Sequence, residues 1–118
     1  MGTLTCEQGK VYVAVTKKCV NFASEESYKI LSGSTVLLTS AAFANNELRT
    51  DEYCLNAAPN NQYTFRMIDT YQSSGDSWSS GSWVSIAGQY GNIVLKNFMT
   101  ERVTEDIPVS LYYPVMKN

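Results

Sequence analysis

The sequence predicts an all-β fold, an antiparallel β-sandwich with jelly-roll-like topology and seven to eight short strands. Runs that alternate apolar and polar residues, or are rich in β-branched residues, recur along the whole chain. Turn residues separate these runs at a spacing of roughly 8–12 residues, as in sandwiches and small barrels. The chain has 118 residues and no visible linker or internal repeat, so we expect a single domain over residues 1–118.

Four of the strands are expected before residue 56. Val11, Val13 and Val15 alternate with other residues, a pattern that is typical of a strand. Gly33, between two serines, interrupts two strand-like runs and predicts a hairpin. Residues 40–45 hold several alanines, which favour a helix, but the segment is short, so helix and loop both stay open. The four strands are expected over residues 11–17, 26–31, 35–39 and 48–55.

The second half of the chain repeats this pattern. Tyr63, Phe65 and Met67 alternate with polar residues, so we expect them to face the core. Val84 and Ile86 are expected to point inward in the same way. The strands are expected over residues 63–69, 83–87, 93–98 and 109–113, with residues 100–106 as a polar connection.

Charge and composition argue against nucleic acid and membrane as partners. The net charge is −2, and the nine basic residues are scattered along the chain. A basic patch of the kind that binds nucleic acid is therefore not visible, nor is a polybasic stretch for a membrane surface. The longest apolar runs are far too short to span a bilayer.

The composition favours an extracellular or secreted protein over a cytosolic one. Charged residues make up only 17% of the chain, a balance that is more common in extracellular β proteins. The first residues lack the pattern of a signal peptide. Met1-Gly2 has the look of a cloning start, so we favour a mature form or a piece of a secreted protein.

The absence of histidine argues against an enzyme. The chain has no His, so Ser-His-Asp and Cys-His catalysis cannot occur within it. Carboxylate pairs such as Glu26 with Asp69, or Glu101 with Asp106, could serve glycoside hydrolysis, but nothing in their spacing shows that they converge. We therefore expect a protein without catalytic activity.

Three cysteines allow three different single disulfides. The pairing that we favour is Cys6 with Cys54, which would stabilise the fold by about 3–4 kcal/mol in the chain-entropy model. Cys6 with Cys19 is disfavoured, because an extended strand between them would hold them apart. Cys19 would then be free and buried, or paired between molecules. Three reduced, buried cysteines remain the alternative.

The loop between two predicted strands, residues 69–91, is the best candidate for a metal site. It holds Asp69 and Asp76 among Ser and Gly residues, and Glu26 could join them. Ca²⁺ takes six to eight oxygen ligands, which carboxylates and exposed loop carbonyls supply. The alternative is that Asp69 caps a strand and Asp76 forms an Asx-turn.

Aromatic residues of the same region predict a ligand-binding surface. Trp78, Tyr71 and Trp83 could bind a protein or carbohydrate surface, because aromatic faces bury apolar area at low entropic cost. The alternative is that Trp83 packs in the core and Trp78 pins the loop.

The last predicted strand offers a surface for self-association. Tyr112 and Tyr113 lie beside Val109 and Leu111. At a sheet edge this strand could pair with another copy of the chain. The alternative is an ordinary paired strand.

The order of several short motifs resembles a secreted β-sandwich module found in extracellular proteins of microbes and protists. More distantly, the layout is similar to CUB domains, which are disulfide-linked sandwiches, some of which bind Ca²⁺. The resemblance covers roughly residues 6–98, although Ser77 stands where many such loops have Gly. The motifs are E-x-S-Y at residues 25–28, C-L at 54–55, Y-x-F-x-x-x-D at 63–69 and G-D-S-W at 75–78.

The resemblance implies an accessory or adhesive module without catalysis of its own. The expected function is therefore a non-catalytic extracellular binding or adhesion module of a secreted or cell-surface protein. A self-assembling structural subunit of a filament, coat or extracellular matrix is the alternative.

Overall fold

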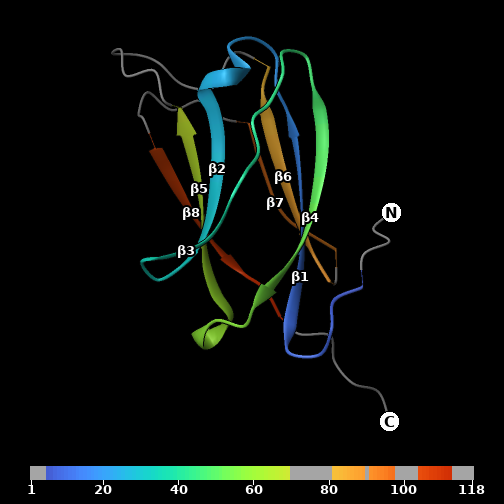
Figure 1. Cartoon of the computed structure of the whole chain (residues 1–118), viewed down its shortest axis with the longest axis vertical. Coiled ribbons are helices and arrows are strands. Elements are labelled where there is room, and N and C mark those ends of the chain that lie inside the picture. The colour runs from blue at the N-terminus through green and yellow to red at the C-terminus, as the bar shows by residue number, and fades with distance from the viewer. Residues whose placement is uncertain (1–4, 70–80, 90, 98–103, 113–118) are drawn as a thin grey trace.

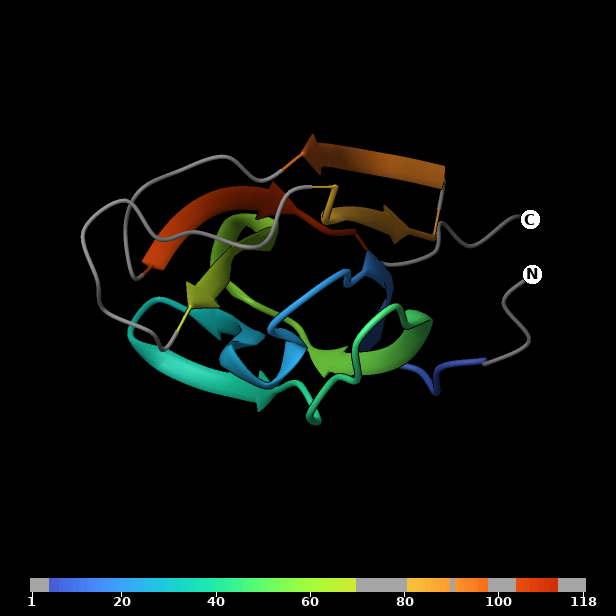
Figure 2. The same ribbon diagram turned by 90° about the horizontal axis from the view of Figure 1, so that it is seen from above.

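Two antiparallel four-stranded sheets pack face to face, so the predicted all-β sandwich is confirmed (Figure 1). The computed structural model describes residues 5–69, 81–89, 91–97 and 104–112, and the strand count refers to these. Figure 2, which looks along the strands, shows the two layers. One sheet has the order β4 (Leu48–Asn56), β1 (Lys10–Lys18), β6 (Trp83–Gly88), β7 (Gly91–Asn97). The other has the order β3 (Thr35–Thr39), β2 (Glu26–Ser32), β5 (Gln62–Asp69), β8 (Thr104–Ser110).

The connections between strands define the topology. β2 and β3 form a hairpin within one sheet, and β6 and β7 form a hairpin within the other. Every other connection between consecutive described strands crosses from one sheet to the other, as the connections of a jelly roll mostly do. Crossing connections bring sequence-distant strands together, so that β1 lies between β4 and β6.

β1 is a central strand, and its alternating sequence explains its position. Val11, Val13 and Val15 are all buried and point into the core, as predicted. Lys17 continues the same alternation and is buried as well. The inward face of β1 therefore ends on a charged residue.

Aromatic and aliphatic side chains of β2 and β5 form the facing wall of the core. Tyr63, Phe65 and Met67 are buried, which confirms their predicted direction. Tyr28 of β2 packs against Phe65 with ring centroids 5.1 Å apart, and against Phe43 at 6.1 Å. Its hydroxyl group meets that of Tyr53 at 2.6 Å, so its polar end is satisfied inside the core.

The segment before β4 forms no helix, which resolves the alternative that its alanines left open. The Arg49 guanidinium donates hydrogen bonds to the carbonyl oxygens of Ala41 and Ala42 at 3.0 and 2.8 Å. Phe43 from the same segment is buried against the core. Burial of Phe43 and these hydrogen bonds override the local helix propensity.

The predicted position of the last strand was wrong. The structure places β8 at Thr104–Ser110, whereas the sequence predicted residues 109–113, with residues 100–106 as a connection. Asp106 lies in the strand because Arg66 on β5 pairs with it across the ladder, at 2.8 Å. Such cross-strand charge pairs suit a sheet edge, so polar composition did not exclude a strand here.

The disulfide between Cys6 and Cys54 is confirmed, with a Cα–Cα distance of 5.5 Å. It ties the segment ahead of β1 to β4. Cys19 is a free, buried thiol, which is one of the states that the favoured pairing left open.

Candidate functional site

Three charged residues meet at one end of the sandwich core. Lys17 is the last inward-facing residue of β1, Glu26 is the first residue of β2, and Asp69 is the last residue of β5. Glu26 and Asp69 lie directly opposite each other in the β2–β5 ladder. All three are buried, with exposed fractions of 0%, 3% and 2%. We call these residues the core triad.

Within the core triad, Lys17 and Glu26 form an ion pair between the two sheets. Lys17 Nζ lies 2.6 Å from Glu26 Oε1. The same ammonium group lies 5.2 Å from the centre of the Phe43 ring. Charged residues are almost never fully buried unless they are paired, and this pair satisfies that condition.

The structure brings together two of the three predicted metal ligands. Glu26 and Asp69 face each other, while Asp76 lies outside the described residues. The cation beside Glu26 is the chain's own Lys17 ammonium. Among the residues that the structure describes, no group of three or more His, Cys, Asp or Glu side chains could hold a metal ion. A Ca²⁺ site therefore stays a prediction.

The thiol of Cys19 is next to the core triad. Its pKa is raised, chiefly by burial, while the nearby Lys17 ammonium acts in the opposite direction. A raised pKa keeps the thiol protonated, and the thiolate is the reactive form. Cys19 therefore packs as a small apolar side chain.

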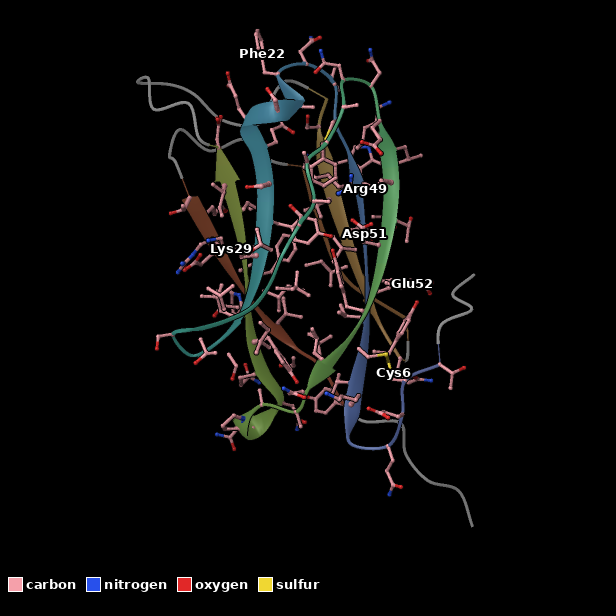
Figure 3. All side chains as sticks on the ribbon, in the orientation of Figure 1. Cys6, Phe22, Lys29, Arg49, Asp51 and Glu52 are labelled. Atoms are coloured by element: carbon pink, nitrogen blue, oxygen red, sulfur yellow. A yellow bond between two sulfur atoms is a disulfide. The ribbon has the colours of Figure 1, made fainter. Side chains whose placement is uncertain are left out.

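A surface hollow of about 490 Å³ lies at the same end of the molecule. Phe22 lines it and is 68% exposed, which is unusual for so large an apolar side chain. Figure 3 shows Phe22 at the opposite end of the sandwich from Cys6. We call this feature the Phe22 hollow. Its lining residues are Asn21, Phe22, Ser24, Phe43, Ala44 and Asn45.

The backbone of Phe22 is held in the left-handed region, with φ of 56°. A residue other than glycine, asparagine or aspartate seldom adopts this conformation, which costs of order 1–3 kcal/mol. Phe22 immediately precedes the short 3-10 helix η1 (Ala23–Glu25). The surrounding structure therefore imposes the exposed position of the ring.

Two loops are joined side by side around the Phe22 hollow. The Ala23 amide donates to the side-chain oxygen of Asn45 at 3.0 Å. The Asn46 amide donates to the Val20 carbonyl at 3.0 Å, and the Cys19 amide donates to the Glu47 carbonyl at 2.8 Å. These bonds fix the walls of the hollow.

Beneath the hollow, Phe43 connects it to the core triad. The guanidinium carbon of Arg49 lies 3.9 Å from the centre of the Phe43 ring, and the Lys17 amine lies 5.2 Å from it. Arg49 is held in turn by Asp51 at 3.0 Å. Phe43 is thus a shared element of both features.

The three aromatic residues predicted to bind a ligand are not brought together by the described structure. Trp83 is half-buried on β6, opposite Lys18 of β1. Trp78 and Tyr71 lie outside the described residues. Phe22 was missed, because a single aromatic residue in a loop has no periodicity that could show its exposure.

The second carboxylate pair considered for catalysis is not assembled by the described residues. Glu101 lies outside them. Asp106 pairs with Arg66, whose hydrogen bond lowers the pKa of that carboxyl group.

Comparisons with protein-family models, with curated proteins and with solved structures give no match to this chain. The resemblance to secreted CUB-like modules therefore stays an expectation. Within the described residues, no helix has the length and apolar character needed to cross a membrane. The disulfide is compatible with a secreted protein.

Proposed function

We propose that the protein is a non-catalytic extracellular binding module and that the Phe22 hollow is its binding face. The observation that carries this proposal is Phe22, a 68% exposed aromatic residue held in a left-handed conformation. Backbone strain of this kind concentrates at functional sites. An exposed ring in water is also costly, and a ligand that covers it would recover that free energy.

The chemistry of the hollow favours a carbohydrate ligand. Phe22 offers an exposed apolar ring, while Asn21, Ser24 and Asn45 place amide and hydroxyl groups beside it. Sugar rings have apolar faces and polar rims, so they match such a mixture. The volume of about 490 Å³ lies within the range of small-ligand sites, whereas protein–protein contacts need broader surfaces.

An extracellular location is supported by the disulfide and by the low fraction of charged residues. Disulfides persist in oxidising compartments and are rare in the cytosol. The bond between Cys6 and Cys54 is therefore easiest to maintain in a secreted protein or on a cell surface. Carbohydrates are abundant in the same places, which fits an adhesive role.

A glycan array would test the proposal. We expect the wild-type protein to bind a subset of glycans and the Phe22→Ala variant to lose at least tenfold in affinity for them. Leu48→Ala is the matched control, because Leu48 is also exposed, at 60%, but lies outside the hollow. Equal binding by wild type and Phe22→Ala would remove the hollow from the function.

Calcium binding is a separate proposal, supported by the convergence of Glu26 and Asp69. A calorimetric titration with Ca²⁺ would show heat of binding, and chelation would lower the melting temperature. A flat titration together with an unchanged melting temperature would overturn the calcium proposal.

The self-assembling subunit remains the alternative function, and β8 is its contact surface. β8 lies at the end of its described sheet, and Tyr112 just beyond it is 53% exposed. However, β8 contains Pro108, and proline on an edge strand opposes pairing with another chain. Sizing at micromolar concentration separates the two functions, because assembly predicts oligomers and the binding module predicts a monomer.

A further inference from the structure

The Lys17 amine lies against the Glu26 carboxyl group in a part of the core that excludes water. Nζ and Oε1 lie 2.6 Å apart, and the two side chains are 0% and 1% exposed. Lys17 belongs to β1 and Glu26 to β2, which lie in opposite sheets. We propose that Lys17 and Glu26 condense to an intramolecular amide that joins the two sheets covalently.

A second carboxyl group stands beside the reacting pair. Asp69 lies directly opposite Glu26 in the β2–β5 ladder and is 2% exposed. Directly opposed residues in an antiparallel pair have Cβ atoms about 4.5–5.5 Å apart. Asp69 can therefore receive a proton from the attacking nitrogen and pass it to the departing oxygen.

The surroundings favour the amide over the ion pair. Lys17 is flanked on β6 by Val84, which is fully buried, and its amine faces the Phe43 ring. Charges are costly to bury even when they are paired, and an amide carries none. Because the site excludes water, the amide is protected from hydrolysis once it has formed.

The reaction needs no oxidant, reductant or cofactor. The Lys17 ammonium first gives one proton to the Glu26 carboxylate, which leaves a neutral amine and a carboxylic acid. The amine nitrogen then attacks Glu26 Cδ, so that a C–N bond forms. Asp69 transfers a proton from the nitrogen to the hydroxyl group on Cδ, the C–O bond breaks and water departs. One ammonium and one carboxylate thus become one amide and one water.

Other ion pairs in the described part of the chain lack this combination. Arg49 and Arg66 contribute guanidinium groups, which are poor nucleophiles, and their side chains are 20% and 35% exposed. The pair formed by Lys17 is therefore the one whose chemistry and burial both suit condensation.

Intact-protein mass spectrometry of the wild-type protein tests the proposal directly. After reduction of the disulfide in denaturant, we expect a mass lower than that of the sequence by one water. A mass equal to that of the sequence would overturn the proposal and leave a plain buried ion pair.

Peptide mapping locates the bond. Trypsin does not cut after an acylated lysine, so we expect residues 11–18 to be joined to residues 19–29 in one branched product. A linear peptide over 11–29 has the same mass, but it has one amino terminus. Stepwise amino-terminal sequencing should release Val11 and Cys19 together in the first cycle. Release of Val11 alone, or of Val11 with Met67 from a bond to Asp69, would overturn the assignment.

Two variants test the roles of the residues. Lys17→Arg should retain the full sequence mass, because the guanidinium cannot take the place of the amine. Asp69→Asn should also retain the full mass while its near-ultraviolet circular dichroism stays that of the wild type. Loss of water in Asp69→Asn would remove Asp69 from the reaction. The wild-type measurements decide the presence of the bond even where a variant does not fold.

Discussion

Phe22 combines two locally unfavourable features. Its ring is exposed, and its backbone has a positive φ that L-residues with large side chains disfavour. Neither property helps the fold, yet the hydrogen bonds between the two flanking loops maintain both. A residue that lowers stability and does not pack in the core is a candidate for ligand binding.

Phe22→Gly should therefore raise stability slightly. Relief of the left-handed strain contributes about 1–2 kcal/mol, and the extra chain entropy of glycine removes about 0.5–1 kcal/mol of it. We expect a net gain of about 0.5–1 kcal/mol in urea unfolding, together with loss of glycan binding. Leu48→Gly is the control, since Leu48 lies in a strand and its replacement should lower stability. A loss in Phe22→Gly would show that the ring packs after all.

Lys17 and Glu26 form a pair whose members depend on each other. Replacing Lys17 with Met removes the ammonium group beside the buried Glu26 side chain, which should cost about 3–5 kcal/mol of unfolding free energy. The double variant Lys17→Met, Glu26→Met should be more stable than Lys17→Met, because two apolar residues need no charge partner. Urea unfolding of the single and double variants measures the recovery. A double variant less stable than Lys17→Met would contradict the coupling.

At the residue scale, sequence reasoning located part of the core triad and missed the rest. Glu26 and Asp69 were named as a pair, and they do lie opposite each other. Lys17 was not named, because lysine is among the residues least often buried, and only the alternation of β1 places it inside. Phe22 could not be predicted, since its exposure depends on the contact between two loops that are distant in sequence.

At the scale of a single element, β8 shows how an edge strand avoids unwanted pairing. The Leu111 amide donates to the Asn61 carbonyl at 3.0 Å, so the amides of every second residue before it also point to β5. Pro108 falls on the alternate set, which faces away from β5. Because proline has no amide hydrogen, it removes a donor from the side of β8 that has no partner strand among the described residues.

Pro108→Thr should accordingly promote self-association. The variant regains the outward amide and keeps a residue that suits strands, so β8 becomes a better template for a second chain. We expect oligomers by size-exclusion chromatography with light scattering at concentrations where the wild type is monomeric. Ser110→Thr is the matched control, because it leaves the edge donors unchanged. A monomeric Pro108→Thr would show that other features protect the edge.

The strands themselves were largely predictable from their alternation, and β8 was the exception. Where one face is buried, as in β1 and β5, periodicity locates the strand and the direction of its side chains. β8 alternates between exposed and half-buried positions over most of its length, so its hydrophobic signal begins only near Val109. The order of the strands in each sheet could not be predicted from the sequence, because it depends on which connections cross between the sheets.

At the scale of the whole molecule, and among the described residues, the groups with raised pKa values are acids that are neutral at pH 7, apart from the Arg66 guanidinium, whose hydrogen bond to Asp106 raises its pKa. Hydrogen bonding to Glu52 raises the pKa of Tyr12 to about 12. Burial is the main cause that raises the pKa values of Tyr28, Tyr53 and Cys19. In each case the folded state holds its proton to a higher pH than the unfolded chain does. Their contribution to stability is therefore complete below about pH 9 and is lost as the pH rises through the folded-state values.

The protein should consequently unfold on the alkaline side. With no histidine in the chain, we expect a nearly constant melting temperature from about pH 6 to 8, and a fall that begins near pH 9–10. Tyr12→Phe should weaken the part of the fall between pH 10 and about 12. Thermal unfolding followed by circular dichroism across this range measures the effect. A steep change between pH 6 and 8 would contradict it.

The disulfide gives the molecule an unequal response to mechanical force. Cys6 and Cys54 are 48 residues apart, and the chain between them includes β1, β2, β3 and the loops of the Phe22 hollow. A force applied to the chain before Cys6 and after Cys54 is transmitted through the disulfide bond. The chain enclosed between the two cysteines therefore carries no load. About 160–170 Å of contour length is thereby withheld from extension. Under a pull that stretches β5 and the strands after it, the enclosed loops would stay closed, and an adhesive contact made by the hollow would not be stretched through its own backbone.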